Sequence, residues 1–110
     1  MEVKLPTGFQ LATASAGFKN AESKDLSLAV SDVPAVAAGV FTTNAFKAAP
    51  VLVGQEIIAG GAPVRAVLVN TGQANACTGD EGLANCRKTM ELIAENFGIS
   101  SHEVLPASTG

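Results

Sequence analysis

The order of apolar and polar residues predicts a succession of short strands in the first half of this chain. Residues 8–18 and 26–32 alternate loosely between apolar and polar side chains, which is typical of strands. Val33 and Pro34 predict a corner, because a proline restricts the residue before it. Residues 35–43 are rich in alanine, valine and glycine and predict a third strand. These segments in succession predict an antiparallel meander.

The second half has the pattern of a strand, a helix and a further strand. Residues 64–70 are β-branched and apolar and predict a buried strand, and residues 102–108 resume a strand. Between them, apolar residues recur at steps of three and four and mark one face of a helix: Leu83, Cys86, Met90, Ile93 and Phe97. Gly98 is expected to end this helix. Strands joined in this way pair in parallel, so the pattern predicts an α/β fold with a mixed sheet.

The segment between these halves, residues 47–61, is ambiguous. Pro50 suits the first turn of a helix, and Gly60 with Gly61 would end one. Gly54 in its middle argues against a helix, because glycine is a weak helix former.

Composition narrows the function classes. The 110 residues are 47% hydrophobic and 15% charged, with neither Trp nor Tyr, so the apolar content is mostly small aliphatic residues that suit layers covered on both faces. The net charge of −3 offers no basic stripe for nucleic acid. Cys77 and Cys86 lack the spacing of a zinc site or a disulfide framework, which indicates reduced thiols and no metal.

The sequence also predicts a cytoplasmic protein without a membrane span. The first eight residues contain no apolar signal core. The longest apolar stretch, residues 28–41, is interrupted by Ser31, Asp32 and Pro34.

Most candidate site residues fit ordinary structural roles. The loop 71–82 contains three glycines, but not in the G-x-G-x-x-G spacing of a dinucleotide site, so no cofactor is expected there. It remains a loop of small residues after a buried strand, where α/β proteins tend to bind ligands. His102, the only histidine, stands among polar residues and is expected at the surface. Asp32 and Glu103 are isolated carboxylates, which gives acid–base chemistry no support.

The segment Ser108-Thr109-Gly110 has two interpretations. A hydroxyl beside a glycine N–H at a strand end offers two donors that can converge on one oxygen, as in an oxyanion hole. Such residues also end strands as plain turns, and the residues alone favour the turn.

Three stretches together resemble one enzyme family. LAVSDVPAVAAGVFTTNAFKAAPV, VLVNTGQANACTGDEGL and VLPASTG closely resemble the ornithine acetyltransferase family, bifunctional glutamate N-acetyltransferases of arginine biosynthesis. The resemblance runs through nearly the whole chain, with Gln73 at a position where the family favours asparagine. It implies the layered α/β sandwich that this family shares with DmpA-like proteins.

The resemblance also implies site residues and partners. Thr109 and Gly110 would form the oxyanion hole, while the nucleophilic threonine lies downstream and becomes the N-terminus of a β chain by self-cleavage. Residues 1–110 would then be a single partial domain of the α chain, inactive alone and completed by downstream residues and the β chain. Two α and two β chains would form a heterotetramer.

The implied reaction moves acetyl from N-acetylornithine to glutamate without a cofactor, and some family members also use acetyl-CoA as a substrate. Two alternatives remain open at this point. One is a self-processing aminopeptidase or hydrolase of related fold, in which water is the acceptor. The other is a non-enzymatic α/β module that binds a partner chain.

Overall fold

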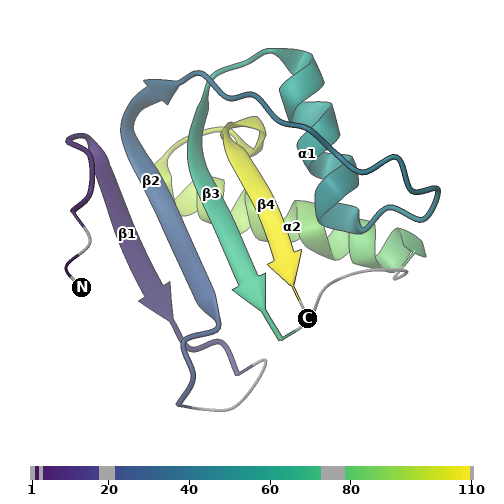
Figure 1. Ribbon diagram of the computed structural model, residues 1–110, viewed down its shortest axis with the longest axis horizontal. Helices are drawn as coiled ribbons and strands as arrows, with labels where there is room; N and C mark the ends of the chain where they lie inside the picture. The colour runs from purple at the N-terminus through teal and green to yellow at the C-terminus, as the bar shows by residue number, and fades with distance from the viewer. Residues whose placement is uncertain (1, 3, 18–21, 73–78, 110) are drawn as a thin grey trace.

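A computed structural model describes residues 2, 4–17, 22–72 and 79–109 of the chain. In these ranges one sheet has the strand order β1-β2-β3-β4, and two helices pack against it (Figure 1). The strands are β1 (Phe9–Ala14), β2 (Leu26–Ala35), β3 (Val64–Thr71) and β4 (Val104–Thr109). The helices are α1 (Ala49–Gly60) and α2 (Gly79–Phe97), and a 3-10 turn, η1 (Ser101–Glu103), precedes β4.

The sheet is mixed, as the sequence predicts. β1 pairs antiparallel with β2, β2 pairs antiparallel with β3, and β3 pairs parallel with β4 through the α2 crossover. The α/β class and the parallel unit are therefore confirmed. The meander is also present, but its third strand is β3 rather than residues 35–43.

The predicted strand over residues 35–43 is wrong. Only Ala35 belongs to a strand, and the chain then leaves the sheet and runs towards α1 as an arch, residues 36–48. The side chains of Val36 and Val40 are each 99% exposed in this arch. Apolar, β-branched composition favours an extended backbone, but a strand also needs a neighbour to pair with, and the arch pairs with none of the described strands.

The predicted corner at Val33 and Pro34 lies inside β2, where the pairing with β3 shifts register between Val30 and Ala35. Arg65 of β3 holds this irregularity. Its Nε donates to the carbonyl of Ser31 at 3.0 Å and its Nη2 donates to the carbonyl of Asp32 at 2.9 Å. Where the register shifts, these two carbonyls therefore bond to the Arg65 side chain instead of to the backbone of β3.

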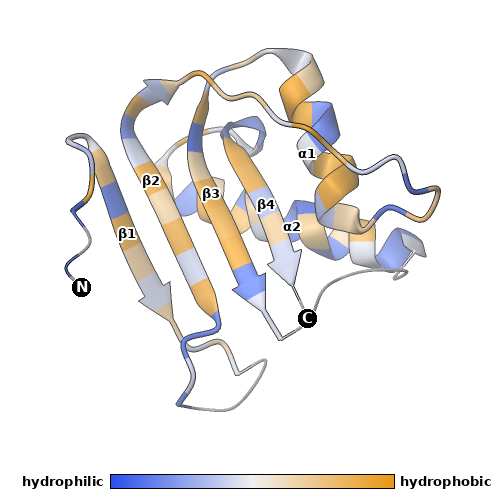
Figure 2. Cartoon of the chain, in the orientation of Figure 1, coloured by the Kyte–Doolittle hydropathy of each residue, from blue (hydrophilic) through white to orange (hydrophobic). Residues whose placement is uncertain are grey.

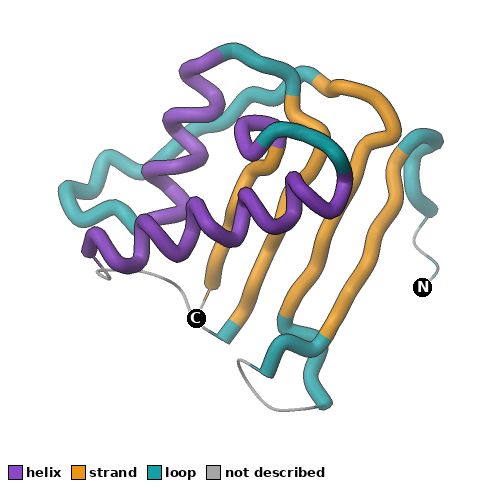
Figure 3. Tube along the Cα trace, turned by 180° about the vertical axis from the view of Figure 1, so that it is seen from behind, coloured by secondary structure: helices purple, strands orange, loops and turns teal. Residues whose placement is uncertain are grey.

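The core lies between the sheet and the helices. α2 crosses one face of the sheet, and α1 lies beside β4 (Figure 3). Alternate residues of β3 point into this core, where Val64, Ala66 and Leu68 are buried. Val104, at the start of β4, is 0% exposed and packs in the same cluster as Met90 and Ala94 of α2.

The face of α2 towards the sheet matches the sequence pattern in part. Its buried residues are Gly82, Cys86, Met90 and Ala94, and Leu83 and Ile93 pack beside them. The helix begins at Gly79, earlier than the predicted loop allows. Phe97 was expected on the buried face but is 48% exposed, because the chain turns at Gly98 and Ile99 packs against the core instead.

The ambiguous segment forms α1, a helix with Pro50 in its first turn and Gly61 as its left-handed C-cap at φ 70°. Gly54 has a packing role within it. A Cβ on Gly54 would lie 3.2 Å from the ring of Phe41, and one on Gly39 would lie 3.1 Å from the same ring. Phe41 therefore anchors the arch against α1 at a place where two glycines leave room for the ring.

The other face of the sheet carries apolar residues that no described helix covers. Figure 2 shows hydrophobic residues along β2, β3 and β4, and alternate ones point away from the helices. Leu11 and Val69 are exposed there. The strand β1 is exposed along its whole length. A hollow of about 200 Å³ is lined by residues that include Phe9, Ala29, Val67 and Leu105.

We expect Gly54→Ala to lower the thermal midpoint of the protein, whereas Gly60→Ala raises it. Both changes favour the helical backbone of α1 by about 0.5–1 kcal/mol. The new methyl group meets the Phe41 ring only at position 54, since nothing lies within 4 Å of a Cβ at position 60. Calorimetry of the two variants tests the difference, and equal stabilisation by both would show that Phe41 does not constrain α1.

Candidate active site

The carboxyl ends of β3 and β4 bring the candidate residues together. The two strands run in the same direction and end at the same edge of the sheet (Figure 1). Their register pairs Asn70 with Ser108 and Thr71 with Thr109. Side chains of small polar residues from two strands therefore meet where the loop after β3 also begins.

Ser108 and Thr109 point to opposite faces of the sheet. Ser108 is half-buried and lines a small cavity of about 40 Å³ between the strand ends and α2, together with Asn70 and Cys86. Its Oγ donates to Asn70 Oδ1 at 2.5 Å. Thr109, the next residue, is exposed, and successive strand residues alternate between faces. Thr109 thus lies on the face that the helices leave open.

Gly110 lies outside the described residues, as do Gln73 and Cys77. The structure therefore places one of the two predicted oxyanion-hole residues. Thr109 is the last residue of β4 and an exposed hydroxyl at a strand end, which fits either an oxyanion donor or the start of a turn.

A buried aspartate lies at the same end of the sheet and was missed in the sequence. Asp25 is 1% exposed and directly precedes β2. Its Oδ1 accepts a hydrogen bond from the N–H of Ala16 at 2.6 Å, and its carbonyl accepts one from the N–H of Thr71 at 2.9 Å. The signal in the sequence was weak, since an aspartate before a strand is usually an exposed turn residue.

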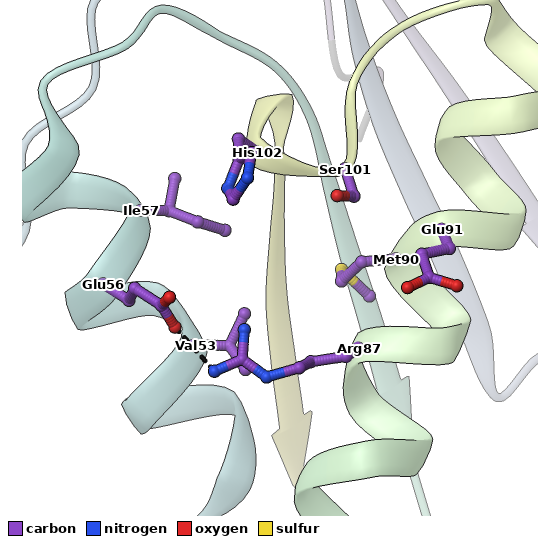
Figure 4. A pocket seen from close by; sticks show the side chains of 8 residues that line it. All are labelled: Val53, Glu56, Ile57, Arg87, Met90, Glu91, Ser101 and His102. Carbon is purple, nitrogen blue, oxygen red and sulfur yellow. Dashed lines mark hydrogen bonds and ion pairs between the residues drawn. The ribbon is translucent and has the colours of Figure 1, made fainter.

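A larger cleft opens at the other end of β4, between α1, α2 and η1 (Figure 4). It has a volume of about 230 Å³ and an apolar floor that includes Val53 and Met90. Arg87 Nη2 and Glu56 Oε2 lie 2.7 Å apart across it, as the dashed line shows. Both side chains are about half exposed, and ion pairs of this kind stabilise a fold by at most about 1 kcal/mol.

The remaining candidate side chains have structural roles. His102 also lines this cleft and is exposed, as the sequence predicts. Glu103 Oε1 accepts the N–H of Ser100 and completes the capping box of η1. Asp32 accepts a hydrogen bond from Gln10 Nε2 at 2.8 Å.

The described residues contain neither a metal-binding cluster nor a membrane-spanning helix. Within the ranges given above, no group of three or more His, Cys, Asp or Glu side chains could hold a metal ion. No helix in these ranges is both long enough and apolar enough to cross a membrane.

Comparison with known proteins decides the family. The sequence model of the ArgJ family matches residues 10–110. The chain belongs to the ArgJ family. The "Arginine biosynthesis bifunctional protein ArgJ" of Nitratidesulfovibrio vulgaris is 59% identical over 105 residues, which are 96% of this chain and 27% of that protein. The protein of the same name from Geobacter sulfurreducens is 50% identical, over 94% of this chain and 26% of its own length.

Solved structures of ArgJ proteins have the same fold. The crystal structure of ornithine acetyltransferase complexed with ornithine from Mycobacterium tuberculosis matches 96% of this chain and 57% of that chain, with a TM-score of 0.89 and 42% identity. The ArgJ structure from Bacillus halodurans matches 94% of this chain and 54% of its own, with a TM-score of 0.88 and 42% identity. The predicted family and fold are thus confirmed, and the chain spans about a quarter of the length of the curated ArgJ proteins.

Cys86, which lines the small cavity beside α2, is a titratable group that its surroundings perturb. Burial raises the pKa of its thiol above the ordinary value of 9.0, and the positive charge of Arg87 opposes that shift. The thiolate is the reactive form of cysteine, so the folded protein holds Cys86 in its unreactive form at neutral pH.

We expect iodoacetamide at pH 8 to label Cys86 more slowly in the native protein than in urea. The unfolded thiol ionises near its ordinary pKa of 9.0 while the folded thiol stays protonated. For the same reason, the contribution of Cys86 to stability is present below pH 9 and is lost as the pH rises towards the raised pKa. Peptide mapping by mass spectrometry separates this site from Cys77, and equal native and denatured rates at Cys86 would contradict its burial.

Proposed function

We propose that this chain forms part of the active site of an acetyltransferase that moves acetyl from N-acetylornithine to glutamate in arginine biosynthesis. Membership of the ArgJ family supports the pathway, because the similar proteins are named arginine biosynthesis bifunctional proteins. The similar structure from Mycobacterium tuberculosis supports the substrate class, since it is an ornithine acetyltransferase with ornithine bound. The enzyme would act in the cytoplasm and need no cofactor, with acetyl-CoA as an additional acetyl donor.

The single observation that carries the role of this segment is the position of Thr109. Its exposed hydroxyl stands at the carboxyl end of a parallel strand, on the open face of the sheet and beside Thr71. A donor at the end of a strand can point at a bound carbonyl, because it is not already used in the hydrogen bonds between strands. In this proposal the Thr109 hydroxyl and the Gly110 N–H bind the oxygen of the tetrahedral intermediate.

The covalent steps belong to residues outside this chain. A threonine made N-terminal by self-cleavage would attack the acetyl carbonyl, with its own α-amine as the base. Ornithine leaves, and glutamate then attacks the acetyl-enzyme. Both half-reactions pass through a tetrahedral oxyanion, so the same two donors would act twice in each turnover.

The proposed assembly is a heterotetramer of two α and two β chains. The apolar face formed by β1, β2 and β3 supports the presence of a partner chain. An exposed apolar patch of this kind usually marks either an interaction surface or a site prone to aggregation. The downstream part of the protein, including the β chain with its nucleophile, is the occupant that this proposal requires.

We expect Thr109→Ala in the complete enzyme to lower kcat by about 10²–10³-fold while KM for N-acetylornithine stays within a factor of two. The hydroxyl acts on a charge that develops only in the tetrahedral state, so substrate binding is spared. Thr109→Ser keeps the donor and is expected to retain most of the activity. Steady-state kinetics, corrected for the folded fraction, measure both variants, and a fully active Thr109→Ala enzyme would make this residue an ordinary turn position.

Residues 1–110 alone are expected to transfer no acetyl group. The proposed nucleophile is absent from them, and oxyanion donors without a nucleophile cannot form the acetyl-enzyme. The test incubates the purified segment with N-acetylornithine and glutamate and follows N-acetylglutamate by mass spectrometry. The complete, self-processed protein is the positive control, and product formation by the segment would place the nucleophile within these residues.

A further inference from the structure

We propose that Asn70 and Ser108 are positioning residues that fix the end of β4, and through it the proposed oxyanion donor Thr109. This inference rests on the function proposed above. Neither residue is proposed to touch the reacting atoms. Each acts by holding the backbone that carries the donor.

The geometry assigns the Ser108 hydroxyl to the sheet rather than to the substrate. Its Oγ donates to Asn70 Oδ1 at 2.5 Å, so its single proton is already used. The side chain also lines the small cavity against α2, on the face opposite Thr109. Of the two neighbouring hydroxyls, the one at position 109 is therefore free of this bond and lies on the open face.

Among the described strands β4 lies at the edge of the sheet, so a side-chain link adds to the bonds that hold its end. Within these residues β4 pairs with β3 alone, and α1 lies beside it. Pro106 has no N–H to give to a backbone hydrogen bond. The bond from Ser108 to Asn70 comes two residues after this proline and one residue before Thr109, so it ties the strand beside the donor.

Asn70, the acceptor of this bond, lies on a strand that is hydrogen-bonded on both sides. The strand is β3, a central strand among those described, and Asn70 pairs with Leu26 of β2. The next residue, Thr71, donates its N–H to the carbonyl of the buried Asp25. Displacement of the β4 end therefore requires breaking a bond to a strand that is fixed from its other side as well.

Small displacements matter for the proposed chemistry. Oxyanion donors act at 2.7–3.1 Å from the developing charge, and a misplacement of about 1 Å can cost on the order of 10²-fold in rate. A catalytic constellation needs supporting residues that hold it within about 0.5 Å. Loss of one side-chain link, with the backbone ladder intact, is expected to cost less than loss of a donor itself.

The test uses the complete, self-processed enzyme. Ser108→Ala and Asn70→Ala are each expected to lower kcat about tenfold with KM unchanged within twofold. The double variant is expected to lose no more than either single one, because both remove the same bond. Ser108→Thr keeps the hydroxyl and is expected to restore most of the activity; if Ser108→Ala does not fold, Ser108→Cys serves in its place.

Thr89→Ala is the matched control. Thr89 lines the same cavity, but its Oγ1 donates to the carbonyl of Asn85 within α2, so kcat should not change. In the background Thr109→Ala, the added change Ser108→Ala should cost less than its own tenfold, since the donor it positions is already gone. A role in stability alone would instead lower the thermal midpoint and leave kcat per folded molecule normal.

Two outcomes separate this inference from the proposed function. If Thr109→Ala is impaired while folded Ser108→Ala and Asn70→Ala keep full kcat, the positioning role is overturned and the oxyanion role stands. If Thr109→Ala itself is fully active, the oxyanion role is overturned and the positioning role with it.

Discussion

The parallel pairing of β3 with β4 is the constraint on which the candidate site depends. Parallel neighbours cannot be joined by a tight turn, so the chain must cross over, and here it does so through α2. The burial of Cys86, Met90 and Ala94 under the sheet sets where the crossover ends and therefore which residues of β4 face β3. A slip of one residue would turn Ser108 to the open face and bury Thr109, because side chains alternate along a strand.

Because of this register, the side chains at the strand ends lie in two groups, one on the helix side of the sheet and one on its open side. On the helix side, Asn70 and Ser108 bond to each other beside the core. On the open side, Thr71 and Thr109 stand next to each other, with apolar residues further along the same face. The cleft with the Arg87–Glu56 ion pair lies at the opposite end of β4 and is separate from this arrangement.

Strong periodicity made the parts near the site predictable. Residues 64–70 and the apolar face of α2 carry dense signals, and both elements are present, although α2 begins at Gly79 and leaves Phe97 exposed. The strand predicted over residues 35–43 is wrong because composition favours an extended backbone but does not show whether a neighbouring strand is there to pair with it. The bond between Asn70 and Ser108 joins residues 38 apart in sequence, so only the register reveals it. The sequence pattern predicted that Thr109 lies at a strand end, but only the family resemblance gave it a role. The packing role of Gly54 could not be predicted, because it depends on a contact with Phe41 that the sequence does not reveal.

The contact of Phe41 with Gly39 and Gly54 has a consequence for how this region tolerates change in length. The arch, residues 36–48, is anchored at one internal point and behaves as two short loops rather than one long one. The entropy of closing a flexible loop grows only with the logarithm of its length, so added residues in one loop cost little and leave the other unaffected. Residues 42–46 form the outer of the two loops and are all exposed; within this loop the N–H of Asn44 donates to Thr42 Oγ1 and the N–H of Phe46 donates to Asn44 Oδ1. Insertions among relatives should collect there, since the ring of Phe41 isolates that loop from the sheet.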